Sequence, residues 1–360
     1  AHVLLEEAPE GHGREVGGNV SVPRCSEVMV DASVRKGLVW QFAGQGTLSA
    51  GVLKGVFESE AAFREGLATC DVILRGLLGF GATELLYPMA SQGSVSEARA
   101  QEILAETRYS QAVLVALEYS LSQVWLSRGH RPSAVMGHSL GEYAAGVVAG
   151  VLSLEDCLRV VCERGRLMQE SEACVGRMVA VRASAAEVTA AIEEAGAASE
   201  VSLAAVNGPR SVVVSGSQAG VDRVLHSSAL TGCSHQPLKV SRAFHSPLMA
   251  SVSDSFEKVL QSVEFHRPSI PMVSTVTGGS VDEEVTSVSY WLRHMMQPVL
   301  YQSAVELVVL MYQTESSGDD IACTVVEMGA DSTLTKMGRG VAKSIASSGS
   351  STVWTCGGEL

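Results

Sequence analysis

The sequence predicts an α/β fold in which a small domain is inserted into a larger one built on a parallel sheet. Three observations lead to this prediction. The chain has 360 residues, enough for about two domains. Short apolar runs alternate with stretches of helical spacing along residues 38–175. Residues 176–241 follow the order β-α-β-β-α-β of a split ferredoxin-like unit.

The first half of the large domain is predicted from its apolar spacing. Residues 38–43 form a short buried strand that ends at a Gly-Gln-Gly turn. Residues 110–127 carry apolar side chains at helical spacing, and a strand over 134–136 leads through a tight turn into a second helix. Residues 153–156 predict a capping box, which opens a further helix to about residue 170.

The inserted domain has its own pattern of elements. Ser246 suits an N-cap and Pro247 a first helical position, so a helix is expected where the large domain resumes. We therefore expect a large domain at 38–175 and 242–342, the small domain at 176–241, a linker at 1–37 and a tail at 343–360. The elements predicted for the small domain are strands over 178–181, 201–206, 212–215 and 237–240, helices over 188–195 and 221–225, and a turn at 207–210.

Composition excludes several functions. Lys and Arg total 26 against 39 Asp and Glu, a net charge of −13 without a basic block, so nucleic-acid binding is not expected. No run approaches ~18 apolar residues, so no membrane span is expected, and the first residues do not resemble a signal peptide. The eight cysteines form no CxxC pair or zinc-type spacing. We therefore expect reduced thiols, no metal and a cytoplasmic location.

The strongest local motif is Gly137-His138-Ser139-Leu140-Gly141. A strand before it and a helix after it are the context of a nucleophile elbow, in which glycines permit a sharp turn that presents the serine. The N–H groups at the start of the helix can stabilise an oxyanion. The alternative is a plain Gly-rich turn between a strand and a helix.

Three further residues are candidates for catalysis or binding. His245 precedes a capped helix, whose positive end disfavours protonation and so suits a base, but an ordinary loop histidine is the alternative. Arg164 lies on the apolar face of its helix. A buried guanidinium needs a partner, and both a structural carboxylate and an anionic substrate remain open. We interpret His138 as structural or as a pocket wall, because successive side chains in an elbow point apart.

Two polar turns complete the candidates. The Gly44-Gln45-Gly46 turn lacks the spacing of phosphate-binding loops, so we expect it to bring Gln45 beside the nucleophile. Asn207 starts an Asn-Gly-Pro turn and is a candidate pocket residue, although this tripeptide is foremost a turn former. The carboxylates show no paired spacing typical of a glycosidase or a metal site.

Several ordered segments together resemble the acyltransferase domains of type I polyketide and fatty acid synthases, which are similar to malonyl-CoA:acyl carrier protein transacylases. The resemblance covers about residues 38–340 and implies a large α/β-hydrolase-like parallel-sheet subdomain with an inserted small ferredoxin-like (βαββαβ) subdomain. The segments are Gly44–Gly46, Thr107–Ala112, Val135–Ala145, Glu163–Gly165, Ala205–Pro209, Ala243–Met249, Trp291–His294 and Glu327–Gly329.

The resemblance also implies a role for several residues. Ser139 matches the acylated nucleophile, His245 the catalytic base, and Arg164 the arginine that holds the free carboxylate of a malonyl group. Gln45 matches a position beside the oxyanion hole, whose second donor is the backbone N–H of Leu140.

A backbone carbonyl, rather than an acidic side chain, orients the histidine in this family. His294 or a neighbour is expected to supply that carbonyl here. Ala243 and Phe244 match malonyl-selecting domains, which read His-Ala-Phe-His where methylmalonyl-selecting domains read Tyr-Ala-Ser-His. The bulky Phe244 would fill the space that a 2-methyl group needs. The chain departs from the family's Gly-Gln-Gly-Ser-Gln at Thr47 and Leu48.

The implied reaction is a ping-pong acyl transfer that needs no cofactor, with malonyl-CoA and an acyl carrier protein as partners. The opening residues 1–9 resemble the end of a ketosynthase domain, so a flanking ketosynthase is expected in a parent chain. Two alternatives remain. A serine thioesterase or hydrolase shares the elbow but has no need of Arg164, and an inactive module could only dock a carrier protein.

Overall fold

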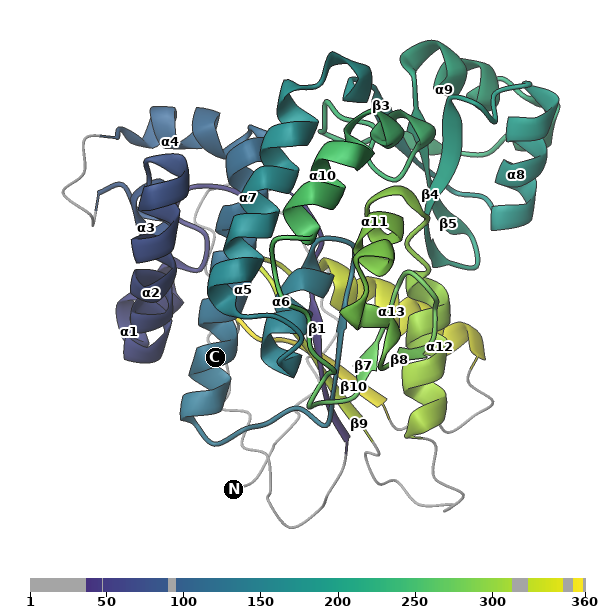
Figure 1. Cartoon of the computed structure of the whole chain (residues 1–360). Coiled ribbons are helices and arrows are strands. Elements are labelled where there is room, and N and C mark those ends of the chain that lie inside the picture. The colour runs from purple at the N-terminus through teal and green to yellow at the C-terminus, as the bar shows by residue number, and fades with distance from the viewer. Residues whose placement is uncertain (1–36, 47, 90–94, 313–322, 346–351, 359–360) are drawn as a thin grey trace, which may run out of the picture.

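Two separate β-sheets organise the structure. The computed structural model describes residues 37–46, 48–89, 95–312, 323–345 and 352–358. A six-stranded sheet lies in the large domain, and a four-stranded sheet forms the inserted domain, which occupies the upper right of Figure 1. The predicted linker at 1–37 lies outside the described residues except for Gly37.

The large sheet consists of β1 (Gly37–Phe42), β2 (Ala134–Gly137), β7 (Met272–Val273), β8 (Ser280–Val281), β9 (Cys323–Met328) and β10 (Thr352–Cys356). The strand order is β10-β9-β1-β2-β7-β8, and each described pair is parallel except β7 with β8. Phe42 and Gly137 are register partners, so the turns after β1 and β2 begin side by side. Ligands of such sheets bind beyond the carboxyl ends of the strands, which is where these turns lie.

The prediction of a tail at 343–360 is wrong for residues 352–356, which form strand β10. This strand pairs with β9, so residues 352–356 belong to the large sheet. Trp354 is only 3% exposed, and a Cβ built on Gly338 of α13 (Thr333–Ile345) would lie 2.1 Å from its indole ring. The Ser-rich residues before this strand are typical of a tail, but the buried tryptophan anchors the segment to the domain.

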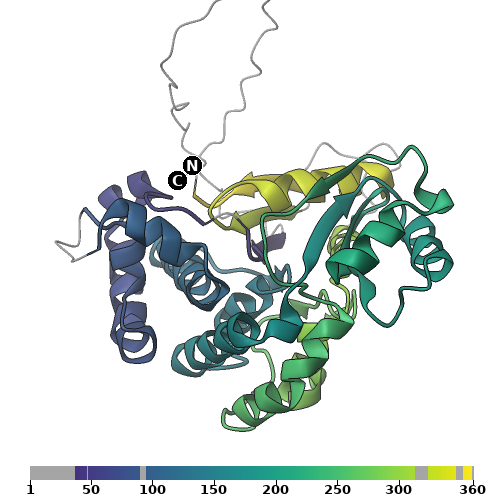
Figure 2. The ribbon, with the colours of Figure 1, turned by 90° about the horizontal axis from the view of Figure 1, so that it is seen from above.

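Helices pack around the large sheet, as Figure 2 shows from above. The predicted helices over 110–127 and 154–170 are confirmed by α5 and α7, and Ser153 caps α7 by accepting the N–H of Asp156 at 3.0 Å. Helix α5 is buried on most sides because it lies between α2 and α7. The helices before the insertion are α1 (Lys54–Ser59), α2 (Ala61–Leu78), α3 (Ala82–Leu86), α4 (Glu97–Leu104), α5 (Thr107–Ser127), α6 (Gly141–Ala149) and α7 (Leu154–Glu170).

The inserted domain has the predicted β-α-β-β-α-β order and an antiparallel sheet. Its elements are β3 (Arg177–Val181), α8 (Ala185–Glu194), β4 (Val201–Gly208), β5 (Ser211–Gly216), α9 (Gln218–Leu225) and β6 (His235–Pro237), in the sheet order β4-β5-β3-β6. A hydrophobic core of its own lies under the helices, around Val179, Val188, Val214 and Val221. The last strand begins earlier than the predicted 237–240, because this edge strand has exposed side chains and therefore no apolar pattern.

The chain returns to the large domain through short helices. The predicted helix after Ser246 begins as a 3₁₀ segment over Pro247–Val252, and Ser246 accepts the N–H of Leu248 at 3.3 Å. Helices α10 (Ser253–Leu260), α11 (Val288–Met296), α12 (Tyr301–Met311) and α13 follow, with short 3₁₀ turns at Glu172–Cys174, Ser228–Leu230 and Glu284–Thr286 elsewhere in the chain.

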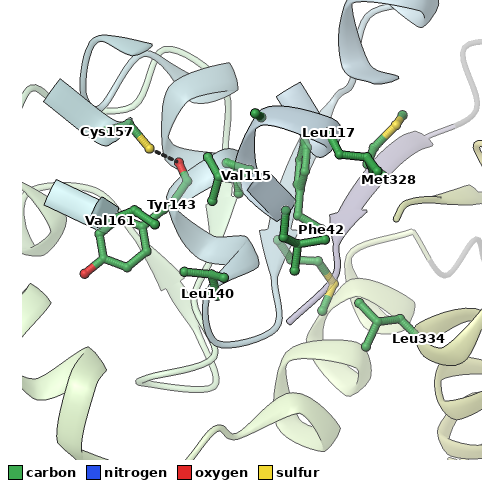
Figure 3. Packing of buried hydrophobic residues seen from close by; sticks show 14 of the residues in the cluster. Phe42, Val115, Leu117, Leu140, Tyr143, Cys157, Val161, Met328 and Leu334 are labelled. Carbon is green, nitrogen blue, oxygen red and sulfur yellow. Dashed lines mark hydrogen bonds between the residues drawn. The ribbon is translucent and has the colours of Figure 1, made fainter. Parts of the chain in front are cut away.

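The core of the large domain reaches the Gly137–Gly141 turn. Figure 3 shows Leu140 packed in the same cluster as Phe42 and Val115, with Tyr143 and Cys157 nearby. This buried Leu140 fixes the turn to the sheet beneath it. Among the helices that the structure describes, none is long and apolar enough to cross a membrane.

Candidate active site

The motif around Ser139 forms a strained turn between β2 and α6. Ser139 has φ 49°, in the left-handed region that non-glycine residues rarely adopt. A Cβ on Gly137 would lie 2.2 Å from the backbone nitrogen of Glu142, and one on Gly141 would lie 2.3 Å from the carbonyl oxygen of Phe42. Only glycine fits at either position, so the spacing of the motif follows from the geometry of the turn.

Ser139 and His245 meet across the two halves of the large domain. The Ser139 Oγ lies 2.6 Å from the His245 Nε2, and the His245 Nδ1 lies 2.9 Å from the carbonyl oxygen of Gln297. A carbonyl only accepts hydrogen bonds, so the Nδ1 carries the proton and donates it. The Nε2 is then free to accept the serine hydroxyl proton, which is the arrangement of a nucleophile with its base.

The backbone carbonyl that orients His245 belongs to Gln297, and not to His294 as expected. His294 lies inside α11, and its Nε2 instead hydrogen bonds to the carbonyl oxygen of Ser139 at 2.9 Å. Gln297 follows the helix with φ −82° and ψ 160°, outside the helical ladder, so its carbonyl is available. Pro298 offers a sequence signal for this end, because the residue before a proline is biased away from helical backbone.

Burial keeps both histidines near Ser139 neutral. It lowers the pKa of His245 to about 3, with a smaller contribution from the positive charge of Arg164, while the hydrogen bond to Gln297 opposes the shift. Burial also lowers the pKa of His294 well below its ordinary value, again with help from Arg164. His245 is therefore present as a free base at neutral pH.

Arg164 is buried and has no acidic partner among the residues that the structure describes. Only 2% of it is exposed, and within the described residues no carboxylate forms an ion pair with it. Its Nη1 donates to the Oε1 of Gln111 at 2.7 Å, and its guanidinium carbon lies 6.0 Å from the centre of the Tyr143 ring. A buried cation that has only neutral partners leaves a place for an anion. The structural-carboxylate interpretation of Arg164 is thus wrong.

Gln45 belongs to a chain of amides that leads to Arg164. Its Oε1 accepts from the Nε2 of Gln111 at 3.0 Å, and its Nε2 donates to the Oγ of Ser110 at 3.0 Å. Both the oxygen and the nitrogen of the Gln45 amide are therefore engaged in hydrogen bonds. The backbone N–H of Gln45 is the donor that is left to stabilise an oxyanion. In the described part of the chain, no protein group accepts the backbone N–H of Gln45 or of Leu140. Gln111 lies in the segment Thr107–Ala112, which contributes to the family resemblance. The sequence analysis did not predict that its side chain would accept from Arg164.

A cavity of about 290 Å³ joins these groups between the two domains. We call it the catalytic cavity. Its wall is mostly apolar and includes Met178, Leu238 and Val240 of the inserted domain as well as Leu334 and Met337 of α13. Ser139, Leu140, Gln45, Arg164 and His245 all line it. The nucleophile, its base and the buried cation thus face the same cavity.

The remaining predicted positions divide into two groups. His138 and Asn207 line the catalytic cavity and are joined, His138 Nε2 to Asn207 Oδ1, at 2.8 Å. Phe244 also lines it and is 6% exposed. Ala243 does not reach the cavity. Ala243 is fully buried, and a Cβ built on Gly176 would lie 2.7 Å from the Cβ of Ala243. The structure therefore places only Phe244 of this pair where it can contact a substrate.

Comparison with known proteins relates the chain to acyltransferases. A family model described as an acyl transferase domain matches residues 39–353. The spectinabilin polyketide synthase system protein NorB of Streptomyces orinoci is 38% identical over 301 residues, 83% of this chain and 13% of that protein. The mycoketide-CoA synthase of Mycobacterium tuberculosis is 37% identical over 302 residues, 84% of this chain and 7% of that protein. The chain thus spans a small part of the length of these relatives.

Solved acyltransferase structures share the fold. The acyltransferase domain from the second module of the salinomycin polyketide synthase matches with a TM-score of 0.76 at 33% identity, covering 89% of this chain and 69% of that one. An acyl carrier protein S-malonyltransferase from Vibrio cholerae reaches a TM-score of 0.74 at 26% identity, covering 89% of this chain and 96% of that one. Both similarities extend over most of the chain.

Proposed function

Because this chain belongs to the acyl transferase domain family and is an acyltransferase, we propose that it moves a malonyl group from CoA to an acyl carrier protein through an ester on Ser139. The observation that carries the choice of substrate is Arg164, a buried cation that lines the same cavity as Ser139 and has no acidic partner in the described part of the chain. A hydrolase of neutral esters would gain nothing from such a cation, whereas a malonyl group brings a free carboxylate.

The first half-reaction acylates the serine. His245 takes the proton from the Ser139 hydroxyl, and the oxygen attacks the thioester carbon. The negative charge on the carbonyl oxygen is met by the backbone N–H of Leu140 and by that of Gln45. When the carbon–sulfur bond breaks, the proton on His245 passes to the CoA sulfur. The malonyl ester remains on Ser139, with its carboxylate held by Arg164.

The second half-reaction reverses these roles. The thiol of a carrier-bound phosphopantetheine gives its proton to His245, and its sulfur attacks the ester. The proton then returns to the Ser139 oxygen as the ester bond breaks, and a malonyl thioester leaves on the carrier. No resident cofactor is needed, because the chain itself supplies the nucleophile, the base and the oxyanion donors.

Phe244 supports malonyl as the preferred acyl group. Its ring lines the catalytic cavity, so a branched acyl group has less room there than it would beside a serine. A difference of one methyl group contributes only ~1–3 kcal/mol to discrimination. We therefore propose preference for malonyl over methylmalonyl, with partial acceptance of the larger group.

The relatives support a multidomain context. The two curated relatives are named as synthases or parts of synthase systems, and this chain matches only a fraction of each. We propose that the domain works beside a ketosynthase in such a chain. A cytoplasmic location is consistent with the buried thiols of Cys70, Cys157 and Cys323, which would stay reduced there.

The proposal is tested by the intact mass of the protein after mixing with equal malonyl-CoA, methylmalonyl-CoA and acetyl-CoA. We expect a dominant malonyl adduct that is absent from the Ser139→Ala variant. Arg164→Gln should lose malonyl labelling at least tenfold more than acetyl labelling, and its residual acetyl adduct shows that the site still folds. Free CoA without an adduct would support a thioesterase instead, and neither product would support an inactive docking module.

A further inference from the structure

We propose that Tyr143 is a positioning residue whose hydroxyl holds Arg164 in place for the carboxylate of the acyl group. Tyr143 lies in the first turn of α6, the helix that follows the Ser139 turn, and it is fully buried. It is not among the described residues that line the catalytic cavity, so it would act through Arg164 rather than on the substrate. This inference rests on the proposed function, because it concerns acyl groups that carry a carboxylate.

The hydroxyl of Tyr143 has no hydrogen-bond partner among the residues that the structure describes. A buried hydroxyl without a partner costs free energy, because it has given up its hydrogen bonds to water. A phenylalanine would fill the same space without this cost. The Nε of Arg164 is also buried and without a partner in the described part of the chain. The phenolic oxygen is an acceptor and the Nε–H is a donor, so the two unpartnered groups are complementary.

Tyr143 and Arg164 lie close to each other. The guanidinium carbon is 6.0 Å from the centre of the Tyr143 ring. Burial lowers the pKa of Arg164, and the nearby Tyr143 hydroxyl opposes this shift, which favours the charged form that binds a carboxylate. The Nη1 of Arg164 donates to the Oε1 of Gln111 at 2.7 Å. With Gln111 at one end of the guanidinium and Tyr143 at the other, the remaining N–H groups are left for an anion in the catalytic cavity.

The Tyr143 ring is fixed by aromatic neighbours. Its centre lies 4.6 Å from the centre of the Trp291 ring and 5.1 Å from that of His294. His294 in turn hydrogen bonds to the carbonyl oxygen of Ser139 at 2.9 Å. From α7, the Sγ of Cys157 donates to the carbonyl of Tyr143 at 3.7 Å, as Figure 3 shows. The hydroxyl is therefore held at a fixed place relative to the nucleophile and to the helix that carries Arg164.

The role of this hydroxyl differs between acyl groups. A malonyl group has a carboxylate for Arg164, whereas an acetyl group has none. The carboxylate is not part of the bonds that form and break, so the arginine holds it equally in the ground state and in the transition state. Losing such an interaction raises KM and leaves kcat unchanged. We therefore expect the hydroxyl to affect the KM of malonyl-CoA and neither constant of acetyl-CoA.

The test is Tyr143→Phe, which keeps the ring and removes the hydroxyl. We expect the KM of acylation by malonyl-CoA to rise about tenfold, the range of a hydrogen bond to a charged group, with kcat nearly unchanged. The constants for acetyl-CoA should stay at their wild-type values. The midpoint of urea unfolding should not fall, because no hydrogen bond is lost. Equal losses with both donors, no loss with either, or a lower midpoint would overturn the proposal.

The matched control is Tyr87→Phe. Tyr87 is also buried, but its hydroxyl donates to the carbonyl oxygen of Val52 at 2.7 Å, and it is not part of the cavity lining. The control should lower the urea midpoint and leave the ratio of malonyl to acetyl acylation unchanged. A comparable change in this ratio would show that loss of any buried hydroxyl alters the selectivity, and it would overturn the proposal.

A double-mutant cycle tests whether Tyr143 acts through Arg164. In the Arg164→Gln background, the added Tyr143→Phe change should have no further effect on malonyl acylation. A second tenfold loss in this background would show an action independent of the arginine and would overturn the proposal. Failure of the wild-type protein to form a malonyl adduct, or unchanged malonyl labelling of Arg164→Gln alone, would instead refute the proposed function.

Discussion

Both members of the Ser139–His245 pair occupy strained backbone. Their φ values are 49° and 56°, in a region that costs non-glycine residues free energy. The carbonyl of each residue is held by another side chain, since Ser139 accepts from His294 and His245 accepts from Ser202. These two bonds keep the backbone in the conformation that brings the Oγ and the Nε2 together. The strain thus lies in the backbone of the two residues whose side chains react, and the surrounding structure compensates for it.

The first prediction concerns the pH dependence of acylation. Because the pKa of His245 is lowered to about 3, the base is neutral throughout the range from pH 5 to 8. We expect the single-turnover acylation rate to be flat in this range when measured by rapid quench and mass spectrometry. An acid limb with a midpoint near the ordinary histidine value of about 6.5 would contradict the assignment.

The free energy of unfolding also depends on pH and has to be measured beside the acylation rate. The unfolded chain protonates His245 near its ordinary pKa of about 6.5, whereas the folded chain resists protonation. The unfolded state therefore binds more protons below that pH, and the free energy of unfolding falls as the pH drops. Urea unfolding at each pH separates this loss from a loss of rate.

At the scale of elements, a buried carboxylate joins the elbow helix to α11. Glu142, in the first turn of α6, accepts the hydroxyl of Tyr290 from α11 and the N–H of Thr275 at 3.0 Å. The Ser274 Oγ lies 2.6 Å from the same Tyr290 oxygen and donates to it, because the single phenolic proton is given to Glu142. Helix α11 and the residues after it provide His294 and the carbonyl of Gln297. The position of α11 relative to α6 therefore sets the geometry around both Ser139 and His245.

The second prediction tests this connection with Tyr290→Phe. Removing the hydroxyl leaves buried Glu142 without one of its donors, which should lower the free energy of unfolding by about 1–3 kcal/mol. A small shift of α11 should also slow acylation about tenfold with little change in KM. Urea unfolding and rapid-quench acylation measure the two effects.

The control for this change is Tyr119→Phe. Tyr119 is half-buried on α5, and its hydroxyl makes no hydrogen bond within the described residues. It should leave both quantities near their wild-type values. A Tyr290→Phe protein that is destabilised but acylates at the wild-type rate would show that the bond has no positioning role.

At the scale of the whole molecule, strand β10 and helix α13 support one wall of the catalytic cavity. Strand β10 closes one edge of the large sheet, and its Trp354 packs on α13. Helix α13 in turn supplies Leu334 and Met337 to the catalytic cavity. Removing this support should therefore affect both stability and the cavity wall.

The third prediction is that Trp354→Ala lowers the free energy of unfolding by about 3–5 kcal/mol, because it leaves a cavity between β10 and α13. Val353→Ala, a half-buried neighbour on the same strand, should cost clearly less. Urea unfolding of the two variants measures the difference. Equal, small losses would return residues 352–356 to the status of a tail.

The sequence by itself determined the features that are local along the chain. The strand, turn and helix around Ser139 follow from glycine spacing, since only glycine fits at Gly137 and Gly141. The β-α-β-β-α-β unit follows from apolar periodicity within short segments. The family resemblance follows from ordered motifs. Such features depend on neighbouring residues and are therefore visible without a structure.

Only the tertiary structure decided how distant segments combine. It assigned the carbonyl of Gln297, rather than one from His294, to His245. It also showed that Gln111 accepts from Arg164 and that no acidic side chain among the described residues pairs with this arginine. It also placed β10 in the large sheet. The physical reason is that a counter-ion, a carbonyl acceptor or a sheet partner is defined by proximity in space. Residues tens of positions apart supply these groups, and no local pattern records which of them will meet.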